Sequence, residues 1–236
     1  MAKLLMWLFA AGKMGKLLTT GGTMLLSLVV YSWVFGWRYA AGFVLMLFVH
    51  EMGHYVAARQ RGLDVGLPAF IPFVGAWVTL KDAPPDPETE AYVAFAGPVA
   101  GTVAAMACYF AARDTGSQLL FALAYSGCML NLINLIPTAM LDGGRISAIV
   151  SPKLWLLGVP LLAALFFYHP SPMLILIGIM AYPQLKAAIW GDPELALKYQ
   201  SVPREVRINY GVMYLALVIF LAIMSYDIHA LIESRR

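Results

Sequence analysis

Formal charge is scarce in this chain of 236 residues. Asp, Glu, Lys and Arg make up 12% of it, against about 25% in an average soluble domain, while hydrophobic residues make up 61%. The net charge is only +3 and the basic residues are scattered, so the sequence lacks the basic patch that binds nucleic acid. This composition predicts a protein built for lipid, with the bilayer as a partner and no nucleic-acid partner.

Cysteine is also rare. Cys108 and Cys128 are the only two, and each lies in a charge-free run, which favours small buried side chains over a disulfide or a metal site. They leave the redox compartment undetermined. The sequence has no internal repeat and no room for a sizeable soluble insertion, so we expect a single domain, residues 1–236.

Charge-free apolar sequence, by contrast, is abundant, and it predicts an all-α polytopic membrane protein with about six to seven transmembrane helices. The expected spans are residues 17–37, 39–61, 91–112, 117–141 and 208–226, with two short passes inside 154–185. Residues 1–13 are expected to form an interfacial helix. With the N-terminus in the cytoplasm, most Lys and Arg residues fall on the cytoplasmic side, as the positive-inside rule requires. The exceptions are Arg38, Arg113, Arg235 and Arg236.

The run His50-Glu51-Met52-Gly53-His54 places three ionisable side chains inside the second apolar span. On a helix, His50 and His54 project from one face, which is the spacing of two zinc ligands. Glu51 is turned about 100° from His50, too far to bind the same ion but within reach of a water on it. Ionisable groups at this depth are costly and therefore indicate function. The competing interpretation is a chance match or a buried, satisfied histidine pair.

A carboxylate that could complete this set occurs at Asp142. It follows an apolar helix that Pro137 ends, and Gly143-Gly144 permits an irregular backbone there. Taken alone, Asp142 could equally be a helix cap. Catalytic zinc takes three protein ligands, and two histidines with one carboxylate is a known set, so we expect Asp142 to be the third ligand. The predicted topology puts Arg59 and Arg145 on one side, so both segments approach the bilayer from the same face.

The segment between these motifs is apolar but unsuited to a helix. Pro68 and Pro72 are four residues apart and Gly75 follows, whereas residues 76–80 have strand propensity. Non-helical backbone inside a membrane must be buried in protein or line a cavity. We therefore expect a re-entrant, β-hairpin-like segment near the active site, with an ordinary interfacial loop as the alternative.

With these residues identified, the sequence resembles the site-2 protease family, zinc metalloproteases that cut inside membranes. His50-Glu51-Met52-Gly53-His54 matches its first motif, and the run from Asn134 to Gly143 fits its N-x-x-P-x-x-x-L-D-G pattern. Ala96-Gly97-Pro98 is similar to its intervening helix. Thr138-Ala139-Met140 departs from the proline-rich residues often found in the family. The likeness is to compact members without a PDZ domain.

The resemblance implies an intramembrane metalloprotease domain, with a core at about residues 23–150 and accessory helices at about 153–230. It implies one Zn²⁺ per chain, bound by His50, His54 and Asp142. Glu51 would be the catalytic base, and Asn134 would orient the substrate or stabilise the oxyanion.

The implied substrate is the transmembrane helix of another protein, unwound near the scissile bond so that it can add to the hairpin edge. The residues expected to bind it are Gly75, Ala76, Trp77 and Asn131. We expect a multi-pass integral membrane protein whose active site opens to the cytoplasmic side. The sequence leaves the oligomeric state unknown.

Three other functions compete with this one. A metalloprotease with a downstream Glu as third ligand finds no such Glu in the charge-free spans, and a zinc transporter would spread its ligands over several spans. A catalytically inactive zinc-binding membrane protein that binds or chaperones transmembrane helices stays open. Glu51 argues against it, because a structural zinc site needs no base.

Overall fold

The computed structural model describes residues 20–235 apart from 73–74, 79–83, 139 and 169, so the interfacial helix expected at residues 1–13 lies outside this part. The described chain is mostly helical, as predicted. Its helices are Thr20–Phe35, α2 (Trp37–Gln60), α3 (Pro87–Thr115), α4 (Gln118–Asn134), α5 (Asp142–Val150), the 3₁₀ helix η1 (Pro152–Leu157), α6 (Gly158–Tyr168), α7 (Pro172–Trp190), α8 (Pro193–Gln200) and α9 (Arg204–Glu233). Two short strands, β1 (Ala69–Ile71) and β2 (Gly75–Trp77), lie between α2 and α3.

Local sequence accounts for where the long helix α3 begins and ends. The Asp86 side chain accepts a hydrogen bond from the backbone N–H of Thr89, and Pro87 occupies the first helical position, where no intrahelical N–H is needed. Gly116 ends the helix with a φ of 69°, a left-handed conformation that glycine adopts without strain.

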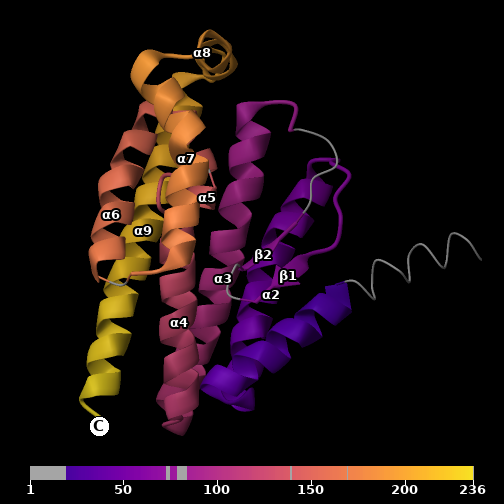
Figure 1. Ribbon diagram of the computed structural model, residues 1–236, viewed down its shortest axis with the longest axis vertical. Helices are drawn as coiled ribbons and strands as arrows, with labels where there is room; N and C mark the ends of the chain where they lie inside the picture. The colour runs from indigo at the N-terminus through magenta and orange to yellow at the C-terminus, as the bar shows by residue number, and fades with distance from the viewer. Residues whose placement is uncertain (1–19, 73–74, 79–83, 139, 169, 236) are drawn as a thin grey trace, which may run out of the picture.

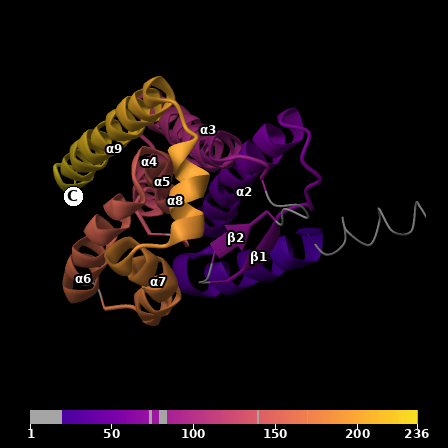
Figure 2. The same ribbon diagram turned by 90° about the horizontal axis from the view of Figure 1, so that it is seen from above.

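The helices α2, α3 and α4 pack side by side, and α9 lies against α4 and α5 (Figures 1 and 2). One apolar core joins α3, α4 and α9, with Phe121, Cys128 and Leu221 fully buried in it. The prediction of a buried, unpaired cysteine is confirmed for Cys128, whereas Cys108 is free but only partly buried.

The two strands form an antiparallel hairpin in which Phe70 pairs with Ala76 and Ile71 pairs with Gly75. Phe70 is buried, and its ring stacks on that of Phe48 in α2 at a centroid distance of 6.5 Å, so the hairpin packs beside the helix that carries both histidines. The depth of the hairpin in a membrane stays a prediction.

Three of the described helices, α2, α3 and α9, are long and apolar enough to cross a membrane, and the bent pair α7–α8 could be a fourth. The expected count of about six to seven spans therefore stays a prediction. Shorter apolar helices cover other expected spans, namely Thr20–Phe35, Gln118–Asn134 and Pro152–Tyr168.

Candidate metal centre

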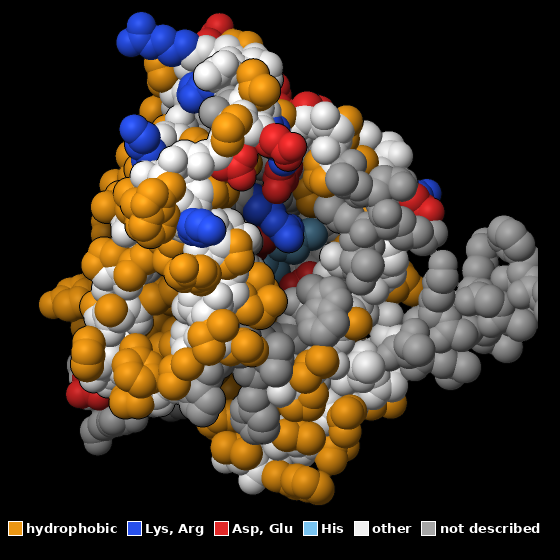
Figure 3. All heavy atoms as spheres, turned by 45° about the horizontal axis from the view of Figure 1, so that its top comes forward, with side chains coloured by type: hydrophobic (Ala, Val, Ile, Leu, Met, Phe, Trp, Pro, Cys, Tyr) orange, Lys and Arg blue, Asp and Glu red, His pale blue; other side chains and the backbone are white. Residues whose placement is uncertain are grey.

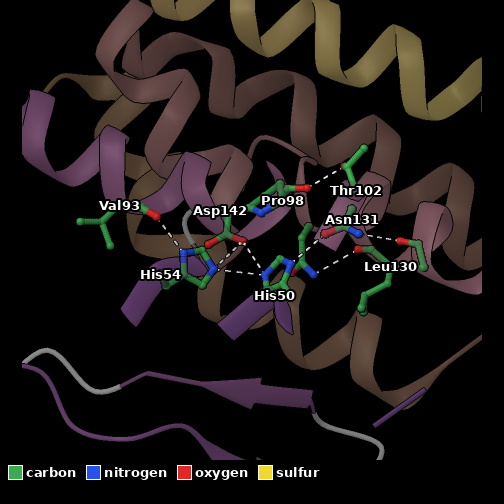
Figure 4. A network of polar contacts seen from close by, with 10 residues as sticks. His50, His54, Val93, Pro98, Thr102, Leu130, Asn131 and Asp142 are labelled. Carbon is green, nitrogen blue, oxygen red and sulfur yellow. Dashed lines mark hydrogen bonds and ion pairs between the residues drawn. The ribbon is translucent and has the colours of Figure 1, made fainter. Parts of the chain in front are cut away.

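Three side chains from two helices converge on one point in the structure. His50 and His54 are buried on one face of α2, and Asp142 lies at the first position of α5 (Figure 4). The Nε2 atoms of the two histidines are 3.1 Å apart. Oδ2 of Asp142 lies 3.2 Å from Nε2 of His50 and 3.3 Å from Nε2 of His54. These atoms form a nearly equilateral triangle.

The opposite ring nitrogens determine which tautomer each histidine adopts. Nδ1 of His54 lies 2.8 Å from the backbone oxygen of Val93, which can only accept a hydrogen bond. Nδ1 of His50 lies 2.8 Å from Oδ1 of Asn131, whose amide nitrogen donates to the Gly127 carbonyl. Both Nδ1 atoms therefore donate, and each neutral ring presents the lone pair of Nε2 to the centre of the triangle.

This donor set fits a zinc ion. When both rings are neutral, two imidazole lone pairs and a carboxylate oxygen have no proton to share, so at these distances they repel one another unless a cation lies between them. Ligands of a tetrahedral zinc with bonds of about 2.0–2.1 Å are about 3.3–3.4 Å apart, close to the 3.1–3.3 Å measured here. Among the described residues, this is the only group of three or more His, Cys, Asp or Glu side chains suited to a metal.

Two glycines of α3 make room for the histidine side chains and their support. A Cβ added to Gly97 would lie 2.1 Å from Nε2 of His54, and one added to Gly101 would lie 2.3 Å from Oδ1 of Asn131. Small residues in a membrane helix usually permit close helix packing. Here, Gly97 also leaves space for the His54 ring, and Gly101 leaves space for the Asn131 amide that orients His50.

Hydrogen bonds from the C-terminal part of the chain stabilise the helix that carries Asp142 and the turn before it. The indole Nε1 of Trp155 donates to the Gly144 carbonyl at 2.8 Å, and the Tyr214 hydroxyl of α9 donates to the Leu135 carbonyl in the preceding turn. Gly143 is needed there because a Cβ at this position would lie 2.1 Å from the Leu135 oxygen. None of these partners is evident from the sequence motifs.

Glu51 is buried beside the three ligand residues and faces a small polar cleft of about 130 Å³. The backbone of Val78, just after β2, forms a hydrogen bond with the Glu51 carboxyl group. The cleft is lined by His50, Glu51, His54, Ala76, Val78, Val93, Asn134, Met140, Asp142 and Arg145.

The structure places some of the residues expected to bind substrate at the cleft and one of them away from it. Ala76 and Asn134 line the cleft, and Gly75 and Trp77 lie in the same strand as Ala76. Asn131 does not contact the cleft: it is 1% exposed, lies behind His50, and uses both ends of its amide on His50 and Gly127. The structure therefore corrects its assignment from a substrate contact to a residue that positions a ligand.

A larger cavity of about 320 Å³ lies between η1, α6 and α7. Its lining is almost entirely apolar, and it contains none of the residues of the metal centre. Its size therefore does not make it the reactive site, because the ionisable groups lie in the smaller cleft.

Comparison with known proteins agrees with this geometry. Residues 38–117 match peptidase family M50. A zinc metalloprotease of Methanocaldococcus jannaschii is 30% identical over 147 residues, which cover 58% of this chain and 42% of that protein. A Mycobacterium tuberculosis protein named as a zinc metalloprotease, Rip3, is 33% identical over 135 residues, covering 54% of this chain and 33% of that protein.

A solved structure of a site-2 protease from Methanocaldococcus jannaschii is also similar. It covers 88% of this chain and 85% of its own, with 19% sequence identity and a TM-score of 0.44. At that similarity, the residue assignments depend on the geometry of this chain.

The apolar helices and the ligand cluster define an integral membrane protein with a site that fits zinc. The two motifs and the similarity to these zinc metalloproteases agree with the match of residues 38–117 to peptidase family M50. The matches span less than half the length of these curated relatives.

Proposed function

We propose that this protein is an intramembrane zinc metalloprotease that hydrolyses a peptide bond within or near the transmembrane segment of a membrane-protein substrate. The observation that carries the proposal is the position of Glu51. It is buried in the same cleft as His50, His54 and Asp142 but is not one of the three clustered ligands. A carboxylate base in the same cleft as three side chains that would hold a metal is the arrangement of a hydrolytic site.

The chemistry requires one metal and one base. Zn²⁺, when bound, supplies a Lewis acid that polarises the scissile carbonyl and makes a water more acidic. Glu51 accepts a proton from the attacking water while the oxygen of that water bonds to the carbonyl carbon. The same carboxyl group then delivers that proton to the leaving nitrogen as the C–N bond breaks. Asn134, in the same cleft, donates to the developing oxyanion or orients the substrate.

The substrate is bound in an extended conformation. A helical segment keeps its carbonyls in internal hydrogen bonds, so it unwinds near the scissile bond before it reaches the metal. Strand β2 pairs with β1 on one edge, and its other edge offers backbone groups to the unwound segment. The cleft opens to the cytoplasmic side, where the positive-inside rule puts Arg145.

A catalytically inactive zinc-binding protein that chaperones transmembrane helices is the second candidate. It would use the same three ligands and the same hairpin. The two functions differ in what they require of Glu51, because only the protease needs a proton acceptor there.

Glu51→Gln tests the proposal. Glutamine keeps the size of the side chain but cannot accept the proton, so we expect the variant to retain about one zinc per chain while cleavage of a single-pass helical reporter falls by about 10²–10⁴-fold. His54→Ala should lose zinc and activity together, because two ligands hold the metal poorly.

Both variants are assayed for metal content and reporter cleavage in liposomes. Cleavage by Glu51→Gln at the parent rate would disprove the mechanism. Loss of zinc from Glu51→Gln would assign Glu51 a structural role. A parent protein that binds zinc but cleaves no helical reporter would favour the chaperone function.

A further inference from the structure

One basic residue in the cleft has no role in the mechanism above. Arg145 lies in the first turn of α5, three residues after Asp142, so the two side chains project from neighbouring positions on one helix face. Its side chain is exposed and lines the cleft together with the ligands and Glu51. Figure 3 shows basic, acidic and histidine side chains gathered in one hollow of this face.

Two acidic residues in the first turn of α3 are paired with other cations. Glu88 forms an ion pair with Arg61 at 3.9 Å, and Glu90 forms one with Lys198 at 2.7 Å. None of the ion pairs among the described residues involves Arg145.

The charge inside the cleft follows from this pairing. The carboxyl groups of Glu51 and Asp142 contribute at most two negative charges, which a divalent ion at the ligand cluster would neutralise. Arg145 then leaves the cleft with a net positive charge. A guanidinium group at the wall of a narrow cleft favours carboxylates, which it binds through paired hydrogen bonds.

We propose that Arg145 forms a carboxylate-binding subsite, so that the enzyme prefers substrates with a carboxylate close to the scissile bond. The proposal rests on the proposed protease function and names a substrate class for the same cleft. Three residues of helix rise about 4.5 Å, and an extended chain advances about 3.3 Å per residue. The bound carboxylate therefore lies within about three residues of the cleaved bond.

Two sources could supply this carboxylate. One is the side chain of Asp or Glu within a continuous substrate, and the other is the free C-terminal carboxylate of a chain already shortened near the site. Both present the same planar group to the guanidinium, so a set of reporters must separate them.

The test uses matched reporters and matched variants. Glu or Gln is placed in turn at each of the three positions on either side of the cleaved bond, and a truncated reporter is made as a free acid and as an amide. The variants are Arg145→Gln, Arg145→Lys and Arg145→Glu. Arg113→Gln is the control, because Arg113 lies near the far end of α3 and its guanidinium contacts Tyr109.

The measured quantity is the preference for the carboxylate, given as the ratio of kcat/KM between each charged reporter and its neutral partner. A charge-assisted hydrogen bond is worth about 1.5–3 kcal/mol, so we expect about 10–100-fold preference at one position in the parent protein. The preference should fall towards 1 in Arg145→Gln, be partly kept in Arg145→Lys, and turn towards the neutral reporter in Arg145→Glu. Arg113→Gln should keep the parent preference.

Binding is compared in the same way. The ratio of Kd between each neutral reporter and its charged partner is measured for zinc-loaded Glu51→Gln protein and for the double variant that also carries Arg145→Gln. This binding ratio separates the two proposals, because an absence of cleavage refutes only the protease function. Preference for an internal Glu assigns the carboxylate to a side chain, and preference for the free acid of the truncated reporter assigns it to a C-terminus. A ratio near 1 in the parent, or a ratio that survives in Arg145→Gln, would overturn the carboxylate subsite.

Discussion

At the scale of single residues, the two histidines are oriented by acceptors on two different helices. His50 donates to the Asn131 side chain on α4, and His54 donates to the Val93 backbone carbonyl on α3. The backbone acceptor cannot be removed by substitution, whereas the Asn131 amide can. Such partners fix the tautomer and the ring orientation of a ligating histidine.

Asn131 should therefore control metal affinity. Asn131→Leu leaves Nδ1–H of His50 without an acceptor, and we expect zinc to bind about 10–100-fold more weakly. Asn131→Asp keeps an acceptor and should retain most of the affinity. Competition with a zinc chelator in detergent measures both values.

Asn134→Leu is the matched control for this prediction. Asn134 lies one turn further along the same helix, and its amide donates to the Leu130 carbonyl rather than to a histidine. We expect Asn134→Leu to bind zinc like the parent but to cleave the reporter more slowly. Equal zinc affinity in Asn131→Leu and the parent would show that Asn131 does not control metal affinity.

At the scale of secondary structure, the start of α3 depends on one cap outside the apolar core. Burial works to raise the pKa of Asp86, but hydrogen bonds from the backbone and side chain of Thr89 outweigh it and lower the pKa below its ordinary value of 3.8. A lowered folded pKa means that the charged cap stabilises the protein above the ordinary pKa. That contribution is lost as the pH falls through the folded value.

Asp86→Ala should therefore destabilise the protein by about 1 kcal/mol near neutral pH, the usual value of an N-cap. The difference from the parent should shrink in acid, where the parent loses its charged cap. Asp86→Asn also caps helices but does not titrate, so it should stay close to the parent at neutral pH. Thermal unfolding in detergent across a pH series measures this, and a pH-independent effect of Asp86→Ala would contradict it.

At the scale of the whole molecule, the charges at the two ends of α3 predict how the protein lies in the membrane. The ion pair between Lys198 and Glu90 lies at the N-terminal end of α3, and Arg113 lies at the C-terminal end. A helix of 29 residues is about 43 Å long, enough to separate these ends by a bilayer.

Cysteine labelling tests this orientation. With an impermeant thiol reagent applied to intact cells, Arg113→Cys should react at once, whereas Lys198→Cys should react only after the membrane is opened. The parent protein gives the background from Cys108 and Cys128, of which Cys128 is fully buried. Labelling of both positions from the same side would refute the predicted topology and the cytoplasmic opening of the cleft.

Short-range patterns in the sequence determine much of this protein. The composition alone indicates a membrane protein, because so few charges cannot cover a soluble surface. The positions of His50 and His54 on one face follow from helix geometry, which needs no tertiary contact. Pro68, Pro72 and Gly75 likewise prevent a helix and leave a hairpin at the metal centre.

Only the tertiary structure decides which distant groups meet. Asn131 and His50 are 81 positions apart, and Gly101 on α3 leaves the space that the Asn131 amide occupies when it accepts their hydrogen bond. The Val93 acceptor is a backbone oxygen, which any residue type could supply, so no sequence motif could reveal it. Arg145 becomes part of the cleft only because α5 docks against the turn after α4, where Gly143 permits the approach. Helix packing brings these groups together, and packing depends on contacts along whole helices that no short pattern contains.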